Sequence, residues 1–172
     1  MKKHNGMRPH DIVVLLKIIC LEESHWLMKD LANELKISQS EISESINRST
    51  IAGLIGSDKR TVNKMSLLDF LKYGLRYVFP QRPGAMVRGI GTGHSAAPLN
   101  SEILSEEQLA WPHGHGEIRG FAVEPLHPNV PEACLLDSCL YELVALTDAL
   151  RMGKAREQNI AFDMIQKRIL RA

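Results

Sequence analysis

The segment from Met28 to Arg48 constrains the fold of this 172-residue chain more than any other stretch. Apolar residues recur in it with the helical period on both sides of a short break, which predicts two helices joined by a tight turn. The small Ala32 would let the second helix cross closely over the first, and Ile37 would fill the gap at the turn. The residues on the facing sides of the two helices are Leu31, Ala32, Leu35, Ile42 and Ile46.

The second helix carries its own start signal. Residues 38–41 have the S-x-x-E pattern of a capping box, in which the Ser38 hydroxyl would accept a hydrogen bond from the amide of Glu41. The Glu41 carboxylate would in turn accept one from the amide of Ser38. The helix is therefore expected to begin directly after Ser38, and Gly53 can end it in a left-handed conformation.

In its small residue, its apolar residue in the turn and the apolar pair beyond it, this segment resembles the helix-turn-helix of DNA-binding regulators. The chain departs from that motif at three positions. Lys36 stands where glycine is usual and would have to adopt a left-handed or nearby backbone conformation. Ser45 and Ser49 stand where apolar residues are normally buried. A plain helical hairpin with no role in nucleic-acid binding is the alternative interpretation.

The residues after the second helix extend the resemblance. Residues 54–62 are predicted to form a short hairpin, with apolar residues at both ends and a charged turn between them. This is similar to the wing of winged helix-turn-helix regulators, in the broad style of the MarR and ArsR families, over roughly residues 9–62. The resemblance implies that Lys59 and Arg60 lie where wings meet the phosphate backbone of DNA. A solvated turn is the alternative for the hairpin alone.

Charge is unevenly distributed along the chain, although the formal net charge is only +1. A basic segment directly after the helix-turn-helix is where contact with a DNA backbone is expected. The acidic middle of the chain could instead hold a basic protein partner. The segment charges, counting Lys and Arg against Asp and Glu, are −3 for residues 22–48, +6 for 59–88, −8 for 101–150 and +4 for 151–172.

Three cysteines, Cys20, Cys134 and Cys139, are too few for a disulfide framework, and their odd number is typical of a reducing cytosol. The apolar run from Ile12 to Cys20 is too short to span a bilayer, and Lys17 interrupts it. We therefore expect a cytoplasmic protein without a membrane partner. Because that run is apolar on most sides, its helix is expected at the centre of the N-terminal domain or across a dimer interface.

The remaining sequence predicts an α+β, mainly α chain in three parts. Residues 9–79 would form the winged helix-turn-helix domain, ending with a helix from Ser66 and a strand at 75–79. Residues 80–131 hold seven of the eight prolines and seven of the twelve glycines, which predicts an extended, irregular arm. A β-hairpin could pair residues 109–111 with 117–123 in this arm. Residues 132–172 would form a C-terminal helical pair that builds a homodimer.

Three motifs suggest other chemistry, and we weigh each against a simpler interpretation. The glycine-rich run 89–94 has neither the lysine nor the following helix of a phosphate-binding loop, so a flexible linker is favoured. His113 and His115 are favoured as a polar turn over a metal site, and Cys134 and Cys139 lack zinc spacing. No catalytic triad or carboxylate pair stands out. We therefore predict no enzyme activity, no cofactor and no metal.

The predicted function is sequence-specific binding of double-stranded DNA by a dimeric repressor. Its second helix would lie in the major groove, where glutamine and asparagine can pair with adenine and glutamate with cytosine. The predicted base-reading residues are Gln39, Ser40, Ser43, Glu44 and Asn47. The predicted phosphate-contacting residues are Lys29, Arg48, Lys59, Arg60 and Lys64.

Two other functions stay open at this point. The same fold could serve as a protein-interaction module, such as an antitoxin-like partner that uses the acidic segment 101–150. The acidic residues of the second helix favour this role, because acids near DNA reduce affinity. A third and weaker hypothesis is an RNA-processing or metal-dependent activity at the histidine-rich turn.

Overall fold

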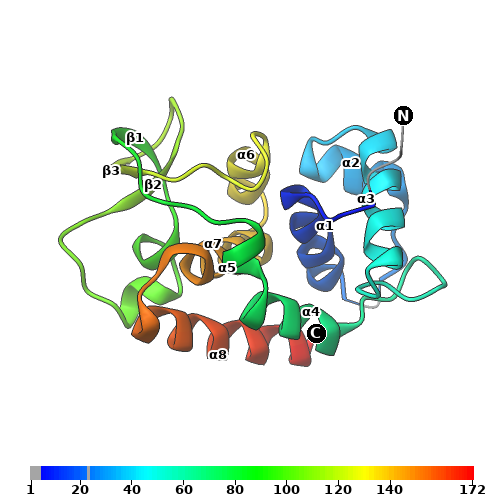
Figure 1. The fold of residues 1–172 in the computed structure, drawn as a ribbon. Coiled ribbons are helices and arrows are strands. Elements are labelled where there is room, and N and C mark those ends of the chain that lie inside the picture. Colours follow the sequence, from blue (N-terminus) through cyan, green and yellow to red (C-terminus); the bar gives the residue numbers. More distant parts are fainter. Residues whose placement is uncertain (1–4, 23) are drawn as a thin grey trace.

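The computed structural model describes residues 5–22 and 24–172. The chain is mainly helical with one small three-stranded sheet, which confirms the predicted α+β, mainly α class. Figure 1 shows two lobes, with α8 running along their lower edge to reach α4. We call residues 9–63 the N-terminal lobe and residues 75–172 the C-terminal lobe. The elements are α1 (Pro9–Cys20), α2 (Met28–Leu35), α3 (Gln39–Ile51), α4 (Lys64–Tyr73), α5 (Leu75–Val78), β1 (Met86–Gly91), η1 (Gly93–Ser95), η2 (Leu99–Ser101), β2 (Leu109–Pro112), β3 (Ile118–Ala122), α6 (Val130–Leu135), α7 (Ser138–Met152) and α8 (Ala155–Arg171).

Helix α1 is the central helix of the N-terminal lobe and also forms its contact with the C-terminal lobe. It packs against α2 and α3 on one side and against α7 on the other. All residues from Ile12 to Leu16 are fully buried by these contacts. The apolar surface of α1 is therefore covered within one chain, so it gives no support to the predicted dimer interface.

The segment after α3 contains one predicted element that is present and one that is wrong. A short hairpin spans residues 54–63, where Ile55 bridges Val62 in antiparallel fashion and Asn63 N–H donates to Leu54 O at 2.8 Å. The strand predicted at 75–79 is instead mostly the short helix α5, whose Leu75 is buried. Helix α5 packs on α7, so a contact remote in sequence selects helix over strand here.

Residues 80–131 are folded, not extended, and the hairpin predicted within them is wrong. Strand β1 runs antiparallel to both β2 and β3, so β2 and β3 lie parallel to each other. The backbones approach closely at two glycines: a Cβ on Gly89 would lie 1.9 Å from Trp111 O, and one on Gly116 would lie 2.1 Å from the Gly89 carbonyl carbon. The glycines predicted to loosen this segment instead allow its strands to cross tightly.

The predicted flexible linker at 89–94 is also ordered. Its first residues end β1, and the next begin η1. The Tyr141 hydroxyl of α7 donates a hydrogen bond to Gly91 O, and η1 packs against α7. This glycine-rich run is therefore part of the packed C-terminal lobe.

A buried carboxylate anchors the sheet to α7. Asp148 Oδ2 accepts hydrogen bonds from Trp111 Nε1 and from Thr92 Oγ1, both at 2.7 Å, and its Oδ1 accepts one from Arg151 Nη1 at 2.8 Å. Arg151 Nε also donates to Phe79 O at 3.0 Å. Because the side chains of Thr92, Trp111, Asp148 and Arg151 are buried, the region predicted as an arm is an integral part of the core.

The two C-terminal helices are present, as the periodicity predicted. Most of α7 is buried in the middle of the C-terminal lobe, and α8 packs across it and against α4. The buried apolar residues of both lobes form one continuous cluster, so the three predicted parts share a core. These helices bury their apolar faces within the chain, which removes the reason for assigning them to a dimer.

Cys20 and Cys139 form a disulfide bond, although three cysteines are too few for a disulfide framework. They are 119 positions apart, with 5.9 Å between their Cα atoms. Cys134 is a buried free thiol. The cysteine count could not reveal the pair, because only the docking of α1 on α7 brings its members together.

No helix in the described ranges 5–22 and 24–172 is both long and apolar enough to cross a membrane.

Candidate nucleic-acid interface

The turn between α2 and α3 has the geometry that the sequence predicted. Lys36 adopts a left-handed conformation with φ 56° and ψ 36°. The Ile37 N–H donates to Ala32 O at 3.1 Å, and the Ile37 side chain is buried. The conformation is unfavourable for a residue with a side chain, so the packing of Ile37 and the following cap must hold it in place.

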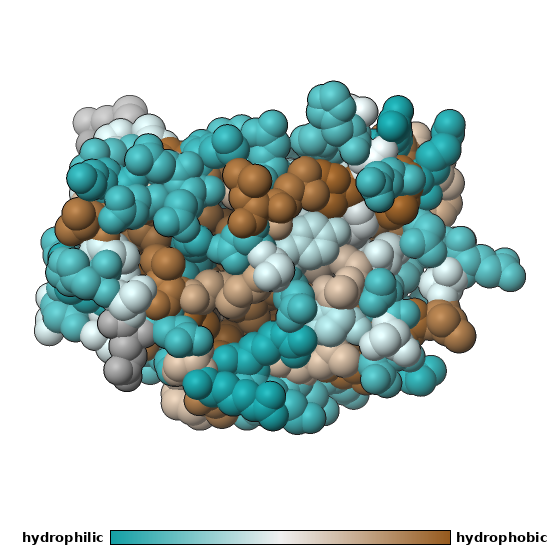
Figure 2. Space-filling model, turned by 180° about the vertical axis from the view of Figure 1, so that it is seen from behind, coloured by the Kyte–Doolittle hydropathy of each residue, from teal (hydrophilic) through white to brown (hydrophobic). Residues whose placement is uncertain are grey.

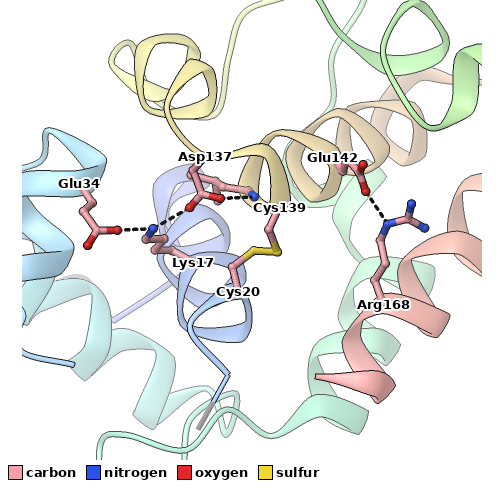
Figure 3. Close-up of a disulfide and its surroundings, with 8 residues drawn as sticks. Lys17, Cys20, Glu34, Asp137, Cys139, Glu142 and Arg168 are labelled. Carbon is pink, nitrogen blue, oxygen red and sulfur yellow. Dashed lines mark hydrogen bonds and ion pairs between the residues drawn. A yellow bond between two sulfur atoms is a disulfide. The ribbon is translucent and has the colours of Figure 1, made fainter. Parts of the chain in front are cut away.

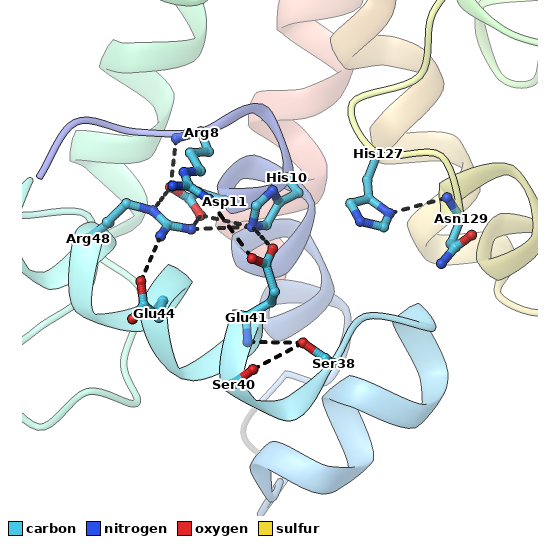
Figure 4. A network of polar contacts seen from close by, with 10 residues as sticks. All are labelled: Arg8, His10, Asp11, Ser38, Ser40, Glu41, Glu44, Arg48, His127 and Asn129. Carbon is cyan, nitrogen blue, oxygen red and sulfur yellow. Dashed lines mark hydrogen bonds and ion pairs between the residues drawn. The ribbon is translucent and has the colours of Figure 1, made fainter. Parts of the chain in front are cut away.

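The predicted capping box is only half formed. Ser38 Oγ accepts a hydrogen bond from the Glu41 amide at 3.3 Å, as expected. The Glu41 carboxylate does not return to the Ser38 amide. It turns towards α1, where its Oε2 lies 3.2 Å from His10 Nε2 and its Oε1 lies 3.9 Å from Arg8 Nη1 (Figure 4). Glu41 therefore joins α3 to α1, and Ser38 alone caps the helix.

The first two turns of α3 present most of the predicted base-reading residues on the surface. Gln39, Ser40 and Glu44 are exposed, and Ser43 is half-buried. Asn47 lies further along and is also half-buried, with its Oδ1 accepting a hydrogen bond from Lys59 Nζ at 2.8 Å. Asn47 therefore ties α3 to the hairpin, and the amino-terminal part of α3 is its accessible polar face.

Asp58 shapes the tip of the hairpin. Its Oδ1 accepts hydrogen bonds from the amides of Arg60 and Thr61 at 3.0 and 3.1 Å, and its Oδ2 accepts one from the Thr61 hydroxyl at 2.6 Å. These bonds, led by that of the Thr61 hydroxyl, lower the pKa of Asp58 to about 2. The carboxylate thus stays ionised near neutrality and holds Lys59 in a left-handed conformation at φ 56°.

A groove of about 590 Å³ separates the amino-terminal ends of α2 and α3 from the hairpin. Arg60 forms one wall. Its guanidinium carbon lies 5.1 Å from the centre of the Trp26 ring, and its Nη1 donates to Trp26 O at 2.9 Å. The groove is lined by Trp26, Leu27, Met28, Lys29, Gln39, Asp58, Lys59 and Arg60.

The structure separates the five predicted phosphate contacts into two groups. Lys29, Lys59 and Arg60 are exposed and line the groove. Lys64 lies apart from it, at the start of α4, where its Nζ donates to Ala172 O. Arg48 is only 5% exposed and cannot reach a phosphate, so its predicted role is wrong. A helical wheel of α3 alone could not reveal that Arg48 faces a carboxylate on α1.

The buried partner of Arg48 is Asp11, and sequence analysis did not identify this pair. Arg48 Nε donates to Asp11 Oδ2 at 2.9 Å, and Arg48 Nη2 donates to Asp11 Oδ1 at 2.7 Å. The fork of the guanidinium therefore meets the carboxylate with two hydrogen bonds (Figure 4). The amide of Arg8 donates to the same carboxylate at 2.8 Å. This pair sets how α3 lies across α1, and so how the exposed face of α3 is presented.

His10 extends the same network towards the C-terminal lobe. Its Nε2 lies 3.2 Å from Arg48 Nη2, and its ring meets that of His127 edge to face at 5.6 Å between centroids. Burial lowers the pKa of His10, although the nearby carboxylates of Asp11 and Glu41 oppose this, and burial also lowers the pKa of His127. Both rings therefore favour the neutral form near pH 7.

The C-terminal lobe also contacts the turn itself. Asn129 Nδ2 donates to Lys36 O at 2.7 Å, and Glu132 Oε2 lies 3.9 Å from Lys36 Nζ. The orientation of the α2–α3 unit is thus coupled to the loop before α6. Nothing in the local sequence around Lys36 indicates this contact.

Two features of the site are polar where apolar groups would pack better. Ser45 and Ser49 are buried against the rest of the N-terminal lobe, at the positions where the motif normally buries apolar side chains. Within the described residues, neither hydroxyl has a hydrogen-bond partner. Such groups reduce the stability of the α3 packing.

The histidine-rich turn and Cys134, the other candidates for chemistry in the sequence, are not brought together with further ligands or reactive groups among the described residues. His113 and His115 lie with ring centroids 6.0 Å apart in the turn between β2 and β3. Across the part of the chain that the structure describes, no group of three or more His, Cys, Asp or Glu side chains is arranged to hold a metal ion. The Cys134 thiol is buried, and this raises its pKa far above the usual range.

Comparison with known proteins adds no relative: no family model, no curated protein and no solved structure matches this chain.

Proposed function

We propose that the protein is a transcriptional regulator that binds double-stranded DNA with a winged helix-turn-helix formed by α2, α3 and the hairpin at 54–63. The observation that carries this proposal is the groove between α3 and the hairpin. Gln39, at the start of the exposed polar face of α3, lines the groove together with Lys29 of α2, and Lys59 and Arg60 of the hairpin line it as well. This combination suits a helix in the major groove beside a cationic contact to the backbone.

In this proposal, the residues have two roles. Gln39, Ser40, Ser43 and Glu44 would read base edges, with Asn47 at the far end of the site. Lys29, Lys59 and Arg60 would contact phosphates and supply affinity without sequence preference. Asn47 has a second role through its bond to Lys59 Nζ, because it sets the spacing between the reading helix and the hairpin.

The direct test is selection of bound duplexes from random DNA by the purified full chain. Recovery of an enriched sequence motif is the expected result, and recovery of unenriched DNA alone would contradict sequence-specific binding. On the selected site, Gln39→Ala is expected to cost roughly 1–3 kcal/mol, and much less on random DNA. Asn33→Ala is a matched control, because this exposed amide of α2 does not line the groove.

Salt dependence tests the phosphate contacts. Lys59→Ala and Arg60→Ala should each lower the slope of log affinity against log salt by about one unit. Lys64→Ala removes the same charge at a position outside the groove, so it should leave the slope unchanged. Filter binding over a salt series measures all three variants. Equal slopes for Lys59→Ala, Arg60→Ala and the parent protein would remove the hairpin from the interface.

The proposal includes a homodimer acting as a repressor on an inverted repeat, with half-sites about one helical turn, roughly 34 Å, apart. Helix α1 does not supply the dimer interface, since its surface is used within the chain. Leu135 and Leu136, at the junction of α6 and α7, are 57% and 79% exposed and offer apolar surface for one. Sedimentation equilibrium should give twice the monomer mass, and a monomer at micromolar concentration would contradict this part.

A protein-interaction module is the second candidate. Leu104 is 93% exposed within a loop that also carries the exposed Glu102, Glu106 and Glu107. Such a loop suits a basic partner with an apolar pocket. If Gln39→Ala leaves specific DNA binding unchanged in a folded protein, α3 does not read DNA and this candidate takes precedence.

A further inference from the structure

Within the described residues, the Cys20–Cys139 disulfide is the only covalent bond between the two lobes apart from the backbone. Cys20 is the last residue of α1, and Cys139 is the second residue of α7. Figure 3 shows the bond bridging these helices beside the ion pairs of Lys17. We propose that this disulfide is a reversible redox lock, which fixes the C-terminal lobe against the α2–α3 unit when oxidised and frees it when reduced. This inference goes beyond the proposed function and does not depend on it.

The bond is open to a thiol reagent. Cys139 is exposed and Cys20 is half-buried. Both line a surface pocket of about 380 Å³, together with Arg168 and Arg171 of α8. The third cysteine cannot exchange with them readily, because Cys134 is only 2% exposed and its burial raises its pKa well above the usual range. The chain thus holds one accessible pair and one inert thiol.

The two cysteines lie at opposite kinds of helix end, and this difference predicts which sulfur is attacked and which one leaves during thiol–disulfide exchange. A thiolate at Cys139 would lie in the first turn of α7, at the positive end of the helix dipole, which stabilises negative charge. A thiolate at Cys20 would lie at the carboxyl end of α1, which disfavours it. Cys139 is therefore the better leaving group in reduction and the more reactive thiolate in oxidation.

Reduction by a dithiol then follows two balanced steps. One reagent thiolate attacks Cys20 Sγ, the Cys20–Cys139 bond breaks, and Cys139 leaves as the thiolate. The second reagent thiolate attacks the reagent sulfur of the mixed disulfide, releases Cys20 as a thiolate and closes the reagent into a cyclic disulfide. The protein gains two electrons, and its thiolates take protons from water as the pH requires.

The disulfide reinforces a contact between α1 and α7 that apolar packing and ion pairs also hold. Lys17 of α1 binds Asp137 Oδ2 at 2.6 Å and also contacts Glu34 of α2. Burial alone would lower the pKa of Lys17, but its bonds to Asp137 and Glu34 raise it. Asp137 also caps α7 through the Leu140 amide at 3.0 Å. On reduction, these ion pairs and the apolar packing of α1 on α7 remain, and the covalent constraint is lost.

The disulfide constrains residues 127–137, and this segment contacts Lys36 in the turn between α2 and α3. Asn129 and Glu132 contact Lys36, and they lie between His127 and the disulfide along the chain. Loss of the covalent link should therefore loosen residues 127–137 and release their hold on the turn. This connects the redox state of one end of α1 to the orientation of α3.

The first experiment measures the lock without any mutation or any DNA. The full chain is equilibrated with oxidised glutathione or with dithiothreitol, and thermal unfolding and amide hydrogen exchange are recorded in each. Reduction should lower Tm by about 10 °C, since the bond closes a long loop. Exchange at residues 127–137 should become at least roughly tenfold faster, as expected for locally released structure. Peptide mapping of the oxidised chain should recover a Cys20–Cys139 link.

Three variants provide the controls. Cys20→Ser and Cys139→Ser should show the Tm of the reduced protein in both buffers. Cys134→Ser should respond to the buffers as the parent does. The remaining accessible thiol should react faster with oxidised glutathione in Cys20→Ser, where it is Cys139, than in Cys139→Ser, where it is Cys20. Equal Tm and equal exchange of the parent in the two buffers, or the absence of the Cys20–Cys139 link after oxidation, would overturn the proposal.

Discussion

Asp11 and Asp148 are both fully buried, and each binds an arginine whose side chain is 6% exposed, yet their surroundings differ. Asp148 is enclosed by Thr92, Trp111 and Arg151, and none of the histidines that the structure describes is among its partners. Its network joins the sheet to α7 and leads to no surface group of the candidate interface.

Asp11 belongs to a network that continues to the surface. Its partner Arg48 lies on α3, close to the exposed Glu44 and to His10, and His10 contacts Glu41. The same chemical pair therefore serves as a closed anchor in one lobe and as a connection in the other. The difference shows that a buried carboxylate–arginine pair does not define a role by itself. The role depends on whether its neighbours are fixed donors or groups that can titrate or move.

The largest expected effect comes from Asp148→Asn. The amide can replace only part of the acceptor capacity of the carboxylate, so at least one buried donor and the Arg151 charge lose their partner. We expect a loss of roughly 3–5 kcal/mol in the free energy of unfolding, measured by urea denaturation. A loss below about 1 kcal/mol would show that the network is not the anchor described above.

Asp11→Asn is the matched change in the N-terminal lobe and should cost less, about 2–3 kcal/mol. Arg48 keeps a second carboxylate partner here, because Glu44 Oε2 lies 3.7 Å from its Nη1. The same urea measurement applies. A cost equal to or greater than that of Asp148→Asn would break the comparison between a closed and an open network.

Thr92→Val sharpens the comparison within the C-terminal lobe. It removes one donor to Asp148 Oδ2 while it keeps the shape of the side chain. Trp111 and Arg151 would still satisfy the carboxylate, so the expected loss is about 1 kcal/mol. Combining Thr92→Val with Asp148→Asn should cost less than the sum of the two separate losses, because they share one bond. Additive losses would contradict that shared bond.

The smallest expected effect is a pH dependence of the free energy of unfolding, which should arise from His10 and His127 beside the Asp11 network and not from the Asp148 network. Burial lowers the folded-state pKa of His10 and of His127 below the usual 6.5, so the unfolded chain binds protons first as the pH falls. The free energy of unfolding should therefore be highest above about pH 6.5 and decline as the pH falls from there towards the folded-state pKa values.

The measurement is urea unfolding at several pH values between 5.5 and 7.5. His10→Gln combined with His127→Gln should flatten this part of the profile, whereas Thr92→Val should shift it without a change in slope. If the double histidine variant keeps the slope of the parent, the titration arises elsewhere.

The sequence alone determined the features that depend on neighbours a few residues apart. The presence of α1, α2 and α3, the start of α3 after the Ser38 cap and the left-handed Lys36 all follow from apolar period, turn chemistry and hydrogen bonds within one turn of helix. The hairpin at 54–63 follows in the same way. These features form wherever the local backbone satisfies its own hydrogen bonds, so the pattern of residues was sufficient to predict them.

Tertiary structure decided everything that joins distant segments. Arg48 and Asp11 are 37 positions apart, Trp111 and Asp148 are also 37 apart, and the two disulfide cysteines are 119 apart. Local signals carry no information about such pairs, because each requires two lobes or two layers to dock first. For the same reason the glycine- and proline-rich region appeared irregular in sequence, although its glycines permit close strand crossing and its Trp111 is buried against α7. The exposed face of α3 was predictable, but what holds that face in place was not.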